Sequence, residues 1–231
     1  MAEPAQIAFA GQSLPHEGAP LHVSGAANYS DDIPLPENAL HVALGMSTIA
    51  HGRIRSMDLS AVAAAPGVVA IVTAADVPGS NMIGPILHDD PIFAQSLVEF
   101  AGQSLFAVAA TSYGAARRAA KLARVEYEEL PAILDIRGAL AAKSFVVPTQ
   151  TLRRGEPETA IGRARHRLSG SAQLGGQEHF YLEGQVAVAV PQEDGGMLVY
   201  SSTQHPTEVQ HMVAHALGRK SHEIMVQCRR M

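Results

Sequence analysis

The chain has 231 residues, of which 47% are hydrophobic, so it can bury one large core or two modest ones. Charged residues make up 17%, below the roughly 25% usual in globular domains, which suggests that something outside the chain covers part of its surface. The formal charge of −5 without a basic block argues against nucleic acid as a partner, and the lack of a long apolar run argues against a membrane role.

The first half of the sequence predicts an irregular arm followed by an α+β unit. In the arm, residues 1–38, Asp31 and Asp32 stand between turn-forming residues and are expected to solvate the turn or cap its amides. Strand patterns then occupy residues 39–47, 52–59, 68–79, 104–112 and 124–130. We expect the second of these strands to be the hairpin partner or neighbour of the first, and the third to be buried. Helices are predicted at residues 59–67, ending at Pro66 and Gly67, and at residues 113–123, capped by Thr111 or Ser112.

Two other segments of this half are rich in polar or turn-forming residues. The loop at residues 79–95 contains His88, Asp89 and Asp90, which could hold a metal but in a loop are more often solvated. Residues 142–160 look like a connecting segment and mark the predicted domain boundary. The cations of the second helix, Arg117, Arg118 and Lys121, are interpreted as a solvated face.

The second half predicts a strand, turn, strand, helix and strand in succession. Alternating residues favour strands at 166–177 and 185–191, and a turn at 193–196 leads into a strand at 197–203. The following helix is expected to begin with a capping box from Thr207 to Gln210 and to end at Gly218. Its apolar stripe is Val209, Met212, Val213, Ala216 and Leu217, and a last strand follows at 222–228.

Gln204 is the most informative polar residue, because it follows a strand and precedes a helix N-terminus. α/β structures place ligands in that crevice. Its amide both donates and accepts hydrogen bonds, which suits an oxo or carbonyl oxygen that must be bound without added charge. The residues alone favour the alternative that this glutamine satisfies loop backbone.

Other candidate residues have simpler explanations. His211 and His215 are four apart on the helix, but the glutamate of a zinc-protease motif is missing, so we expect satisfied histidines at the edge of a core. Residues 175–185, GGQEHFYLEGQ, combine close-approach glycines with acids and a histidine and indicate a site. The single cysteine, Cys228, forms no internal disulfide, fits a reducing compartment such as the cytoplasm, and is interpreted as inert packing.

Several motifs in combination resemble one family. GGQEHFYLEGQ, SSTQHP, AHALG and the terminal CRRM, in this order, closely resemble the molybdenum-binding large subunit of bacterial xanthine dehydrogenases, in the xanthine oxidase family of molybdenum hydroxylases. The first half resembles the α/β hammerhead domain of those subunits through GAANYSDDIPLPENALHVALGMSTIAHGRI, PGVVAIVTAADVPG and GQSLFAVAATSYGAARRAAKLARVEYEELPAIL. The resemblance covers nearly the whole chain from about Gly18.

The resemblance implies an α+β fold and a cofactor. Residues 1–145 would comprise the arm and the α/β hammerhead domain, and residues 146–231 the start of a mixed α/β molybdopterin-binding domain. The implied molybdenum–molybdopterin cofactor is held through its pterin dithiolene, so no residue is expected to coordinate the metal directly. Gln204 would hydrogen-bond an oxygen ligand of the molybdenum, backed by a helix N-terminus. The segment expected near the cofactor contains Gly176, Gln177, Glu178 and His179.

The implied activity is hydroxylation of xanthine or hypoxanthine with water as the oxygen source. Electrons would leave through 2Fe-2S and FAD centres on a partner subunit, in a hetero-oligomer. The family's glycine-rich GGGFGGKE, its substrate arginine and its glutamate base have no counterpart in these 231 residues, so no catalytic residue is assigned within the chain. We therefore expect an N-terminal portion of the molybdenum subunit that is inactive without the rest of that subunit.

Three alternatives remain open from the sequence. Another member of the family would act on an aldehyde or a nicotinate-like heterocycle. A noncatalytic scaffold or assembly module of the same fold would bind no molybdenum. A zinc hydrolase built from His205, His211 and His215 is the most distant of the three.

Overall fold

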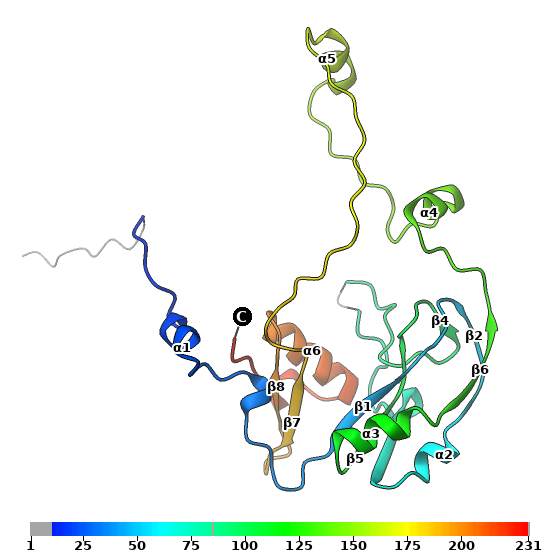
Figure 1. Cartoon of the computed structure of the whole chain (residues 1–231), viewed down its shortest axis with the longest axis vertical. Helices are drawn as coiled ribbons and strands as arrows, with labels where there is room; N and C mark the ends of the chain where they lie inside the picture. Colours follow the sequence, from blue (N-terminus) through cyan, green and yellow to red (C-terminus); the bar gives the residue numbers. More distant parts are fainter. Residues whose placement is uncertain (1–10, 85, 231) are drawn as a thin grey trace, which may run out of the picture. The chain divides into compact units, whose positions relative to one another are not determined.

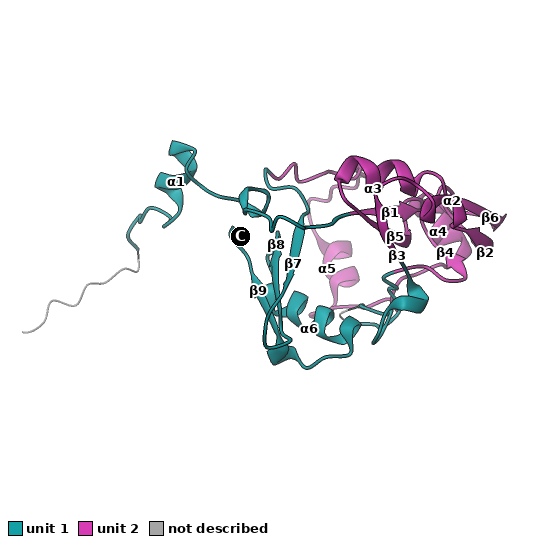
Figure 2. Cartoon of the chain, turned by 90° about the horizontal axis from the view of Figure 1, so that it is seen from below, with its two compact units in different colours: residues 1–41, 72–92, 182–231 teal, residues 42–71, 93–181 magenta. Residues whose placement is uncertain are grey.

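The computed structural model describes residues 11–84 and 86–230 (Figure 1). The chain forms two compact units (Figure 2). The first unit comprises Met1–His41, Val72–Ile92 and Leu182–Met231, and the second comprises Val42–Ile71 and Phe93–Tyr181. Each unit thus collects segments that are distant in sequence, and the division of the chain near residue 145 stays a prediction. Within the described ranges, no helix is long and apolar enough to cross a membrane.

The second unit is built around two three-stranded sheets, with strand orders β1-β5-β3 and β4-β2-β6. The strands of the first sheet are β1 (His41–Met46), β5 (Ser104–Ala110) and β3 (Val68–Thr73). Those of the second are β4 (Leu97–Val98), β2 (Gly52–Asp58) and β6 (Arg124–Glu129). All five strand patterns expected in this half are therefore present, together with the short additional strand β4.

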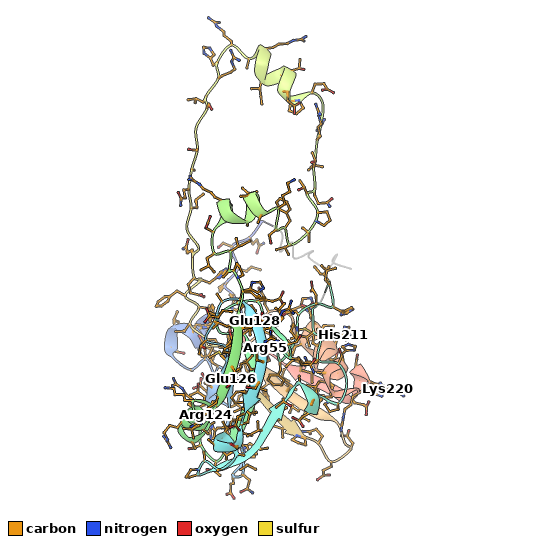
Figure 3. All side chains as sticks on the ribbon, turned by 90° about the vertical axis from the view of Figure 1, so that its right-hand side faces the viewer. Arg55, Arg124, Glu126, Glu128, His211 and Lys220 are labelled. Atoms are coloured by element: carbon orange, nitrogen blue, oxygen red, sulfur yellow. The ribbon has the colours of Figure 1, made fainter. Side chains whose placement is uncertain are left out.

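The expectation that β2 neighbours β1 was wrong, because β2 pairs antiparallel with β4 and β6. Side-chain chemistry explains this choice. On β2, Arg55 forms an ion pair with Glu128 of β6, and Ser56 donates to the Glu126 carboxylate at 3.0 Å (Figure 3). The apolar β1 instead pairs with the apolar β5. Glu128 stands opposite Arg53 and diagonal to Arg55. Opposite charges on such neighbouring positions stabilise a strand pair, and apolar strands stabilise a buried sheet.

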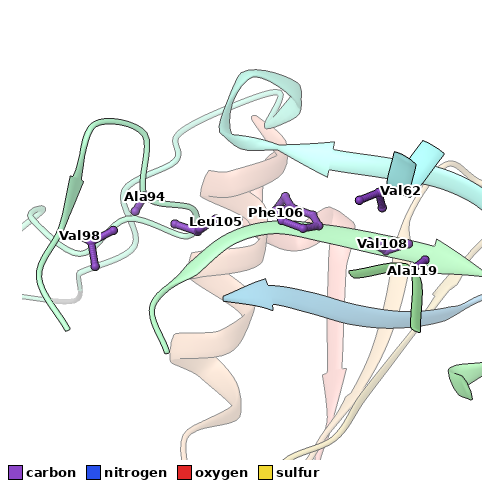
Figure 4. Close-up of a cluster of buried hydrophobic side chains, with 7 residues drawn as sticks. All are labelled: Val62, Ala94, Val98, Leu105, Phe106, Val108 and Ala119. Atoms are coloured by element: carbon purple, nitrogen blue, oxygen red, sulfur yellow. The ribbon is translucent and has the colours of Figure 1, made fainter. Parts of the chain in front are cut away.

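The core of the second unit lies on both sides of β5, the central strand of its sheet. Leu105, Phe106 and Val108 are each at most 1% exposed, and they pack with Val62, Ala94, Val98 and Ala119 (Figure 4). By contrast β3 is not buried as expected, since Val69 is 57% exposed. The reason is its place at the edge of the sheet, where only one neighbouring strand covers it.

Two helices of this unit match their expected positions. α2 (Ser60–Ala63) buries Val62, and α3 (Tyr113–Ala120) buries a row of alanines. Of the two possible caps of α3 the structure has Ser112, whose hydroxyl accepts from the Ala115 amide at 3.2 Å. The expected solvated face is confirmed, because Arg117, Arg118 and Lys121 are exposed.

The segment after β6 carries two short helices that the sequence analysis missed, α4 (Ile136–Ala142) and α5 (Pro157–Arg163). α4 begins at Asp135, whose carboxylate accepts from the Gly138 amide at 2.8 Å. The strand expected at residues 166–177 is absent, so that prediction was wrong. A strand needs a neighbour to accept its hydrogen bonds, and residues 164–182 are exposed throughout.

The first unit contains the sheet β7-β8-β9 and the helix α6 (Pro206–Leu217). β7 (Ala187–Pro191) and β8 (Met197–Ser201) form an antiparallel hairpin across the expected turn, where Gly195 has a φ of 82°. β8 and β9 (Ile224–Gln227) are parallel, and α6 connects them. Val199, Ala214 and Ile224 form the core between helix and sheet.

The capping box expected at Thr207 was wrong. α6 begins at Pro206 and is capped by His205, whose Nδ1 accepts from the Glu208 amide at 3.1 Å. Proline favours the first helical position, because its φ is already fixed and it has no N–H to satisfy. Gln210 instead donates from Nε2 to the Ser221 carbonyl at 3.0 Å and the Ile224 carbonyl at 2.6 Å. The expected stop at Gly218 is confirmed by its left-handed φ of 64°.

The described part of the arm and the loops contain short helical turns: α1 (Ala19–Ser24), η1 (Ser30–Asp32), η2 (Ala74–Asp76) and η3 (Ser221–Glu223). In the arm, the Asp32 carboxylate accepts from the Tyr29 amide at 2.8 Å. This confirms the expectation that the aspartates of this turn cap backbone amides.

Candidate functional site

The candidate site lies at the carboxyl ends of the parallel strands β8 and β9. Gln204 follows β8, and Cys228, Arg229 and Arg230 follow β9. Because carboxyl ends of parallel strands meet at one edge of a sheet, both segments reach the same edge. α6 starts two residues after Gln204, so its N-terminus lies at this edge too. The position expected for Gln204 is thus the one it occupies within this unit.

The loop around Gln204 is held on both sides by hydrogen bonds. The Ser202 hydroxyl accepts from the Val186 amide at 2.8 Å and donates to the Val186 carbonyl at 3.1 Å. The Thr203 hydroxyl accepts from the His205 amide at 3.0 Å, and the Cys228 thiol donates to the Thr203 carbonyl at 2.7 Å. These contacts fix the backbone before and after Gln204 and leave its side chain to project from a supported turn.

The Gln204 side chain is exposed and makes no hydrogen bond to any of the residues that the structure describes. The alternative that Gln204 satisfies loop backbone is therefore not what the structure shows. Ser202 and Thr203 perform that task instead. The Gln204 amide remains available as a neutral donor and acceptor toward a ligand.

The electrostatic environment of this edge suits an anionic group. The N-terminus of a helix carries about half a unit of positive charge, and α6 is twelve residues long. The Arg229 guanidinium lies 5.7 Å from the centroid of the Tyr200 ring. The Nε of Arg230 is buried and has no hydrogen-bond partner among the described residues. The acid in the first turn of the helix is Glu208, whose backbone amide donates to the His205 Nδ1.

Cys228 has a structural role beyond the inert packing expected of it. Its thiol lies 2.7 Å from the Thr203 carbonyl and 2.8 Å from the Arg230 carbonyl and can donate its one proton to either. The bond to Thr203 connects the loop after β8 to the segment after β9. The interpretation as inert packing understated this contact. A signal was available, since a helix between two parallel strands brings the residues that follow each strand together.

Every residue of the segment GGQEHFYLEGQ except Glu183 is exposed, and residues 175–181 form no strand. Gly176, Gln177, Glu178 and His179 belong to the second unit, whereas Gln204 belongs to the first. Their proximity to a cofactor therefore stays a prediction. Glu183, near the end of the segment, is anchored within the first unit, because its carboxylate accepts from the amide of the buried Ser30 at 2.8 Å.

No metal-binding cluster of three or more histidine, cysteine, aspartate or glutamate residues occurs within 11–84 and 86–230. His211 and His215 are exposed, so the expectation of histidines at a core edge was wrong. The ring of His215 lies 6.2 Å from that of His88, whose neighbours Asp89 and Asp90 are exposed as expected. Nothing in these contacts supports the zinc hydrolase.

A groove of about 810 Å³ lies at the opposite end of this sheet, around the turn between β7 and β8. Its walls include the carboxylates of Glu193, Asp194 and Glu223. An acidic wall repels an anionic ligand, and none of the anchored loop residues lines it. We therefore place the candidate site at the Gln204 edge and not in this groove.

Comparisons with known proteins assign both parts of the chain. Residues 24–131 match the family described as aldehyde oxidase and xanthine dehydrogenase, a/b hammerhead domain. Residues 141–231 match the molybdopterin cofactor-binding domain. The expected fold class, a hammerhead domain followed by the first part of a mixed α/β molybdopterin-binding domain, is thereby confirmed.

Xanthine dehydrogenases are among the curated relatives of this chain. Xanthine dehydrogenase/oxidase of Gallus gallus is 41% identical over 222 residues, which are 96% of this chain and 16% of the relative. Xanthine dehydrogenase 1 of Arabidopsis thaliana is 42% identical over 228 residues, again 96% of this chain and 16% of the relative. The chain spans about a sixth of the length of these relatives.

Two solved structures share the fold over most of the chain. Aldehyde oxidoreductase from Desulfovibrio gigas superposes with a TM-score of 0.80 at 25% identity, covering 92% of this chain and 26% of that one. Quinoline 2-oxidoreductase from Pseudomonas putida 86 superposes with a TM-score of 0.78 at 28% identity, covering 94% and 30%.

Proposed function

The chain belongs to the xanthine oxidase family of molybdenum hydroxylases, and from this membership we propose that it serves an enzyme that hydroxylates xanthine or hypoxanthine with water as the oxygen source. In this proposal the chain supplies the hammerhead domain and the first part of the cofactor-binding domain. The reaction as a whole requires residues and redox centres that other parts of the enzyme contribute.

The observation that carries the proposal is that the Gln204 side chain is unpartnered in a loop whose backbone is held in place. Its amide is exposed and unpartnered among the described residues, while hydrogen bonds hold the backbone on both sides. A side chain that is free in a fixed loop can bind without first breaking another contact, so little is lost to reorganisation. The adjacent helix N-terminus favours a negatively charged ligand at the same place.

These residues fit the molybdenum–molybdopterin cofactor. Its metal is held by the pterin dithiolene, so the protein must supply hydrogen bonds and a positive potential rather than metal ligands. Gln204 would hold an oxygen of the bound cofactor, while Arg229 and Arg230 add positive charge at the same edge of the sheet. When bound, the cofactor supplies the two-electron redox chemistry that the side chains of this chain cannot provide.

The runner-up substrate class is an aldehyde or a nitrogen heterocycle. It is favoured by the superposition with an aldehyde oxidoreductase and a quinoline 2-oxidoreductase, at 25% and 28% identity. The purine substrate is favoured by relatives named xanthine dehydrogenase, at 41% and 42% identity. The higher identity supports the purine. Turnover of xanthine, benzaldehyde and quinoline by the same preparation distinguishes the two.

The partners follow from the same proposal. A subunit carrying 2Fe-2S and FAD centres would accept the electrons in a hetero-oligomer, and the 231-residue chain alone would show no turnover. The exposed Gln204 supports this, because a loop open to water cannot provide the enclosed, low-dielectric surroundings in which such a donor is effective. The scaffold alternative makes the opposite prediction for metal, since it forbids stoichiometric molybdenum in the native gene product.

The test is a variant series in the native gene product purified from its own cells. Removing one preorganised donor costs about 100-fold to 1,000-fold in kcat in comparable sites, so Gln204→Ala should lower xanthine turnover by about 100-fold or more. Gln95→Ala, an exposed glutamine on the other unit, is the matched control and should leave kcat unchanged.

Molybdenum content separates binding from rate in this series. Full molybdenum with reduced kcat would support a direct role of Gln204, and reduced molybdenum would support a role in holding the cofactor. An unchanged kcat at full molybdenum would refute the assignment of Gln204. Absence of molybdenum from the wild-type gene product would refute the enzyme and favour the scaffold.

A further inference from the structure

Residues 167–174, RLSGSAQL, have the pattern of a β-strand but no neighbour. Leu168, Gly170, Ala172 and Leu174 occupy one face, and the positions between them are polar. We propose that this segment is an interaction surface that pairs, as an added β-strand, with a strand from the part of the molybdopterin-binding fold that lies outside these 231 residues. The inference goes beyond the proposed reaction and depends on neither molybdenum nor substrate.

The exposure of the apolar face is the first observation. Leu168 is fully exposed and Leu174 is 84% exposed. From Ala141 to Leu182 every residue is exposed except Pro157. Contiguous apolar surface of this kind is unfavourable in water and marks places where another surface packs. The alternation with polar residues indicates that only one face of the segment becomes buried.

The backbone gives the second observation. None of the backbone hydrogen bonds of the described chain involves residues 167–174, and the segment forms neither strand nor helix. Along either edge of the segment, its N–H groups are therefore free to donate to a neighbouring strand and its C=O groups to accept from it. Gly170 has no atom within 4 Å of the place where a Cβ would stand, so the face is open at this position. Strand addition would satisfy the backbone groups and bury the leucines together.

The length of the relatives identifies the partner strand. The molybdopterin-binding match, residues 141–231, includes the segment. Solved structures superpose on more than nine-tenths of this chain, which covers only 26% and 30% of theirs. Those proteins therefore combine this arrangement with a much larger body of chain. A strand from that body, with apolar residues facing Leu168 and Leu174, is the occupant that we propose.

Hydrogen exchange followed by mass spectrometry tests the pairing. Peptides spanning residues 167–174 are compared between the 231-residue chain and the native gene product from its own cells, whether the latter is one longer polypeptide or an assembly. In the chain alone we expect unprotected exchange, and in the native product protection of about 100-fold or more, as for stable strand pairing. Unprotected exchange in both would overturn the proposal. Protection in a homodimer of the 231-residue chain would also overturn it, because the partner would be a second copy.

A pair of double variants tests the face. Leu168→Asp with Leu174→Asp places charges on the apolar face, and Ser169→Asp with Ser171→Asp places equal charge on the polar face. Because all four side chains are exposed, neither variant should change the melting temperature of the isolated chain. In the native product, the leucine variant should lose the protection of residues 167–174 and the serine variant should keep it. Equal effects of both variants would refute the assignment of the buried face, and so would protection that survives the leucine variant.

Discussion

At the scale of the residue, Gly45 shows how one position sets the core of the second unit. The Phe106 ring lies across it, and a Cβ at residue 45 would stand 2.1 Å from the nearest ring carbon. Phe106 is 1% exposed and cannot move into solvent without opening the core. Gly45→Ala should therefore destabilise the chain by roughly 1–3 kcal/mol, as expected for overpacking.

Urea denaturation of the 231-residue chain measures this effect. Gly162→Ala in α5 is the matched control, because no atom lies within 4 Å of its Cβ position. Alanine also favours a helix over glycine by up to about 1 kcal/mol. The control should be neutral or slightly stabilising. If Gly45→Ala were as stable as this control, the packing of Phe106 against β1 would be wrong.

A second residue-scale prediction concerns Asp76, whose pKa is lowered from its ordinary value of 3.8. The hydroxyl and the amide of Thr73 both donate to the carboxylate, at 2.7 and 2.8 Å, and so favour its charged form. The stabilisation is present above pH 3.8 and is lost as the pH falls through the lower, folded-state pKa.

Carboxyl chemical shifts measured by NMR against pH will locate this titration. Thr73→Ala removes the hydroxyl donor and should return the pKa of Asp76 toward 3.8, although the amide donor remains. Thr73→Ser retains a hydroxyl and should keep the pKa low. A pKa of Asp76 that does not change in Thr73→Ala would show that the hydroxyl bond does not form in solution.

At the scale of the element, the N-terminus of α6 distinguishes the cap seen in the structure from the one that the sequence suggested. His205 accepts from the Glu208 amide, while Thr207 lies inside the helix. His205→Ala should cost about 1 kcal/mol, the typical loss for a helix cap, and His205→Asn should retain most of it. Thr207→Ala should cost little.

Thermal unfolding of the three variants decides between the two caps. A larger loss for Thr207→Ala than for His205→Ala would restore the capping box.

The elements also show where sequence patterns suffice. Local signals placed α3 and its cap, the end of α6 at Gly218 and the turn at Gly195, because a few neighbouring residues decide each of them. Pairing was less predictable. Whether β2 joins β1 or β6 depends on contacts between residues about 70 positions apart, such as Arg55 with Glu128.

The features of the candidate site also divide into those that neighbouring residues decide and those that depend on contacts between strands. The place of Gln204 between a strand and a helix could be predicted from its neighbours, and the structure has it there. The support of its loop by Val186 could not, because that contact crosses from one strand to another. The contact with Cys228 was signalled only by the helix that joins two parallel strands. Whether residues 176–179 lie near the same cofactor as Gln204 depends on contacts between the two units, because the residues belong to different units. Their proximity stays a prediction.

At the scale of the whole molecule, the strand predicted at residues 166–177 was wrong because its alternating pattern describes a surface that this chain does not itself cover. The alternating pattern of a strand fits the surroundings in which the strand functions. Those surroundings include neighbours that other parts of the enzyme supply. The low share of charged residues, 17%, has the same explanation if the exposed apolar residues of this region become buried in a larger enzyme.

Limited proteolysis tests this view of the molecule. Residues 141–182 are exposed almost without interruption and contain Arg153, Arg154, Arg163, Arg165 and Arg167. Trypsin requires locally extended, accessible chain, so its first cuts in the 231-residue chain should fall among these arginines. Arg55 and Arg124 are matched controls, since they lie in the paired strands β2 and β6 and should be cut later. In the native gene product the cuts between residues 163 and 167 should be suppressed, because the adjoining segment is then covered. First cuts at Arg55 or Arg124 in the isolated chain would show that the sheet of β2 and β6 is less stable than its pairing indicates.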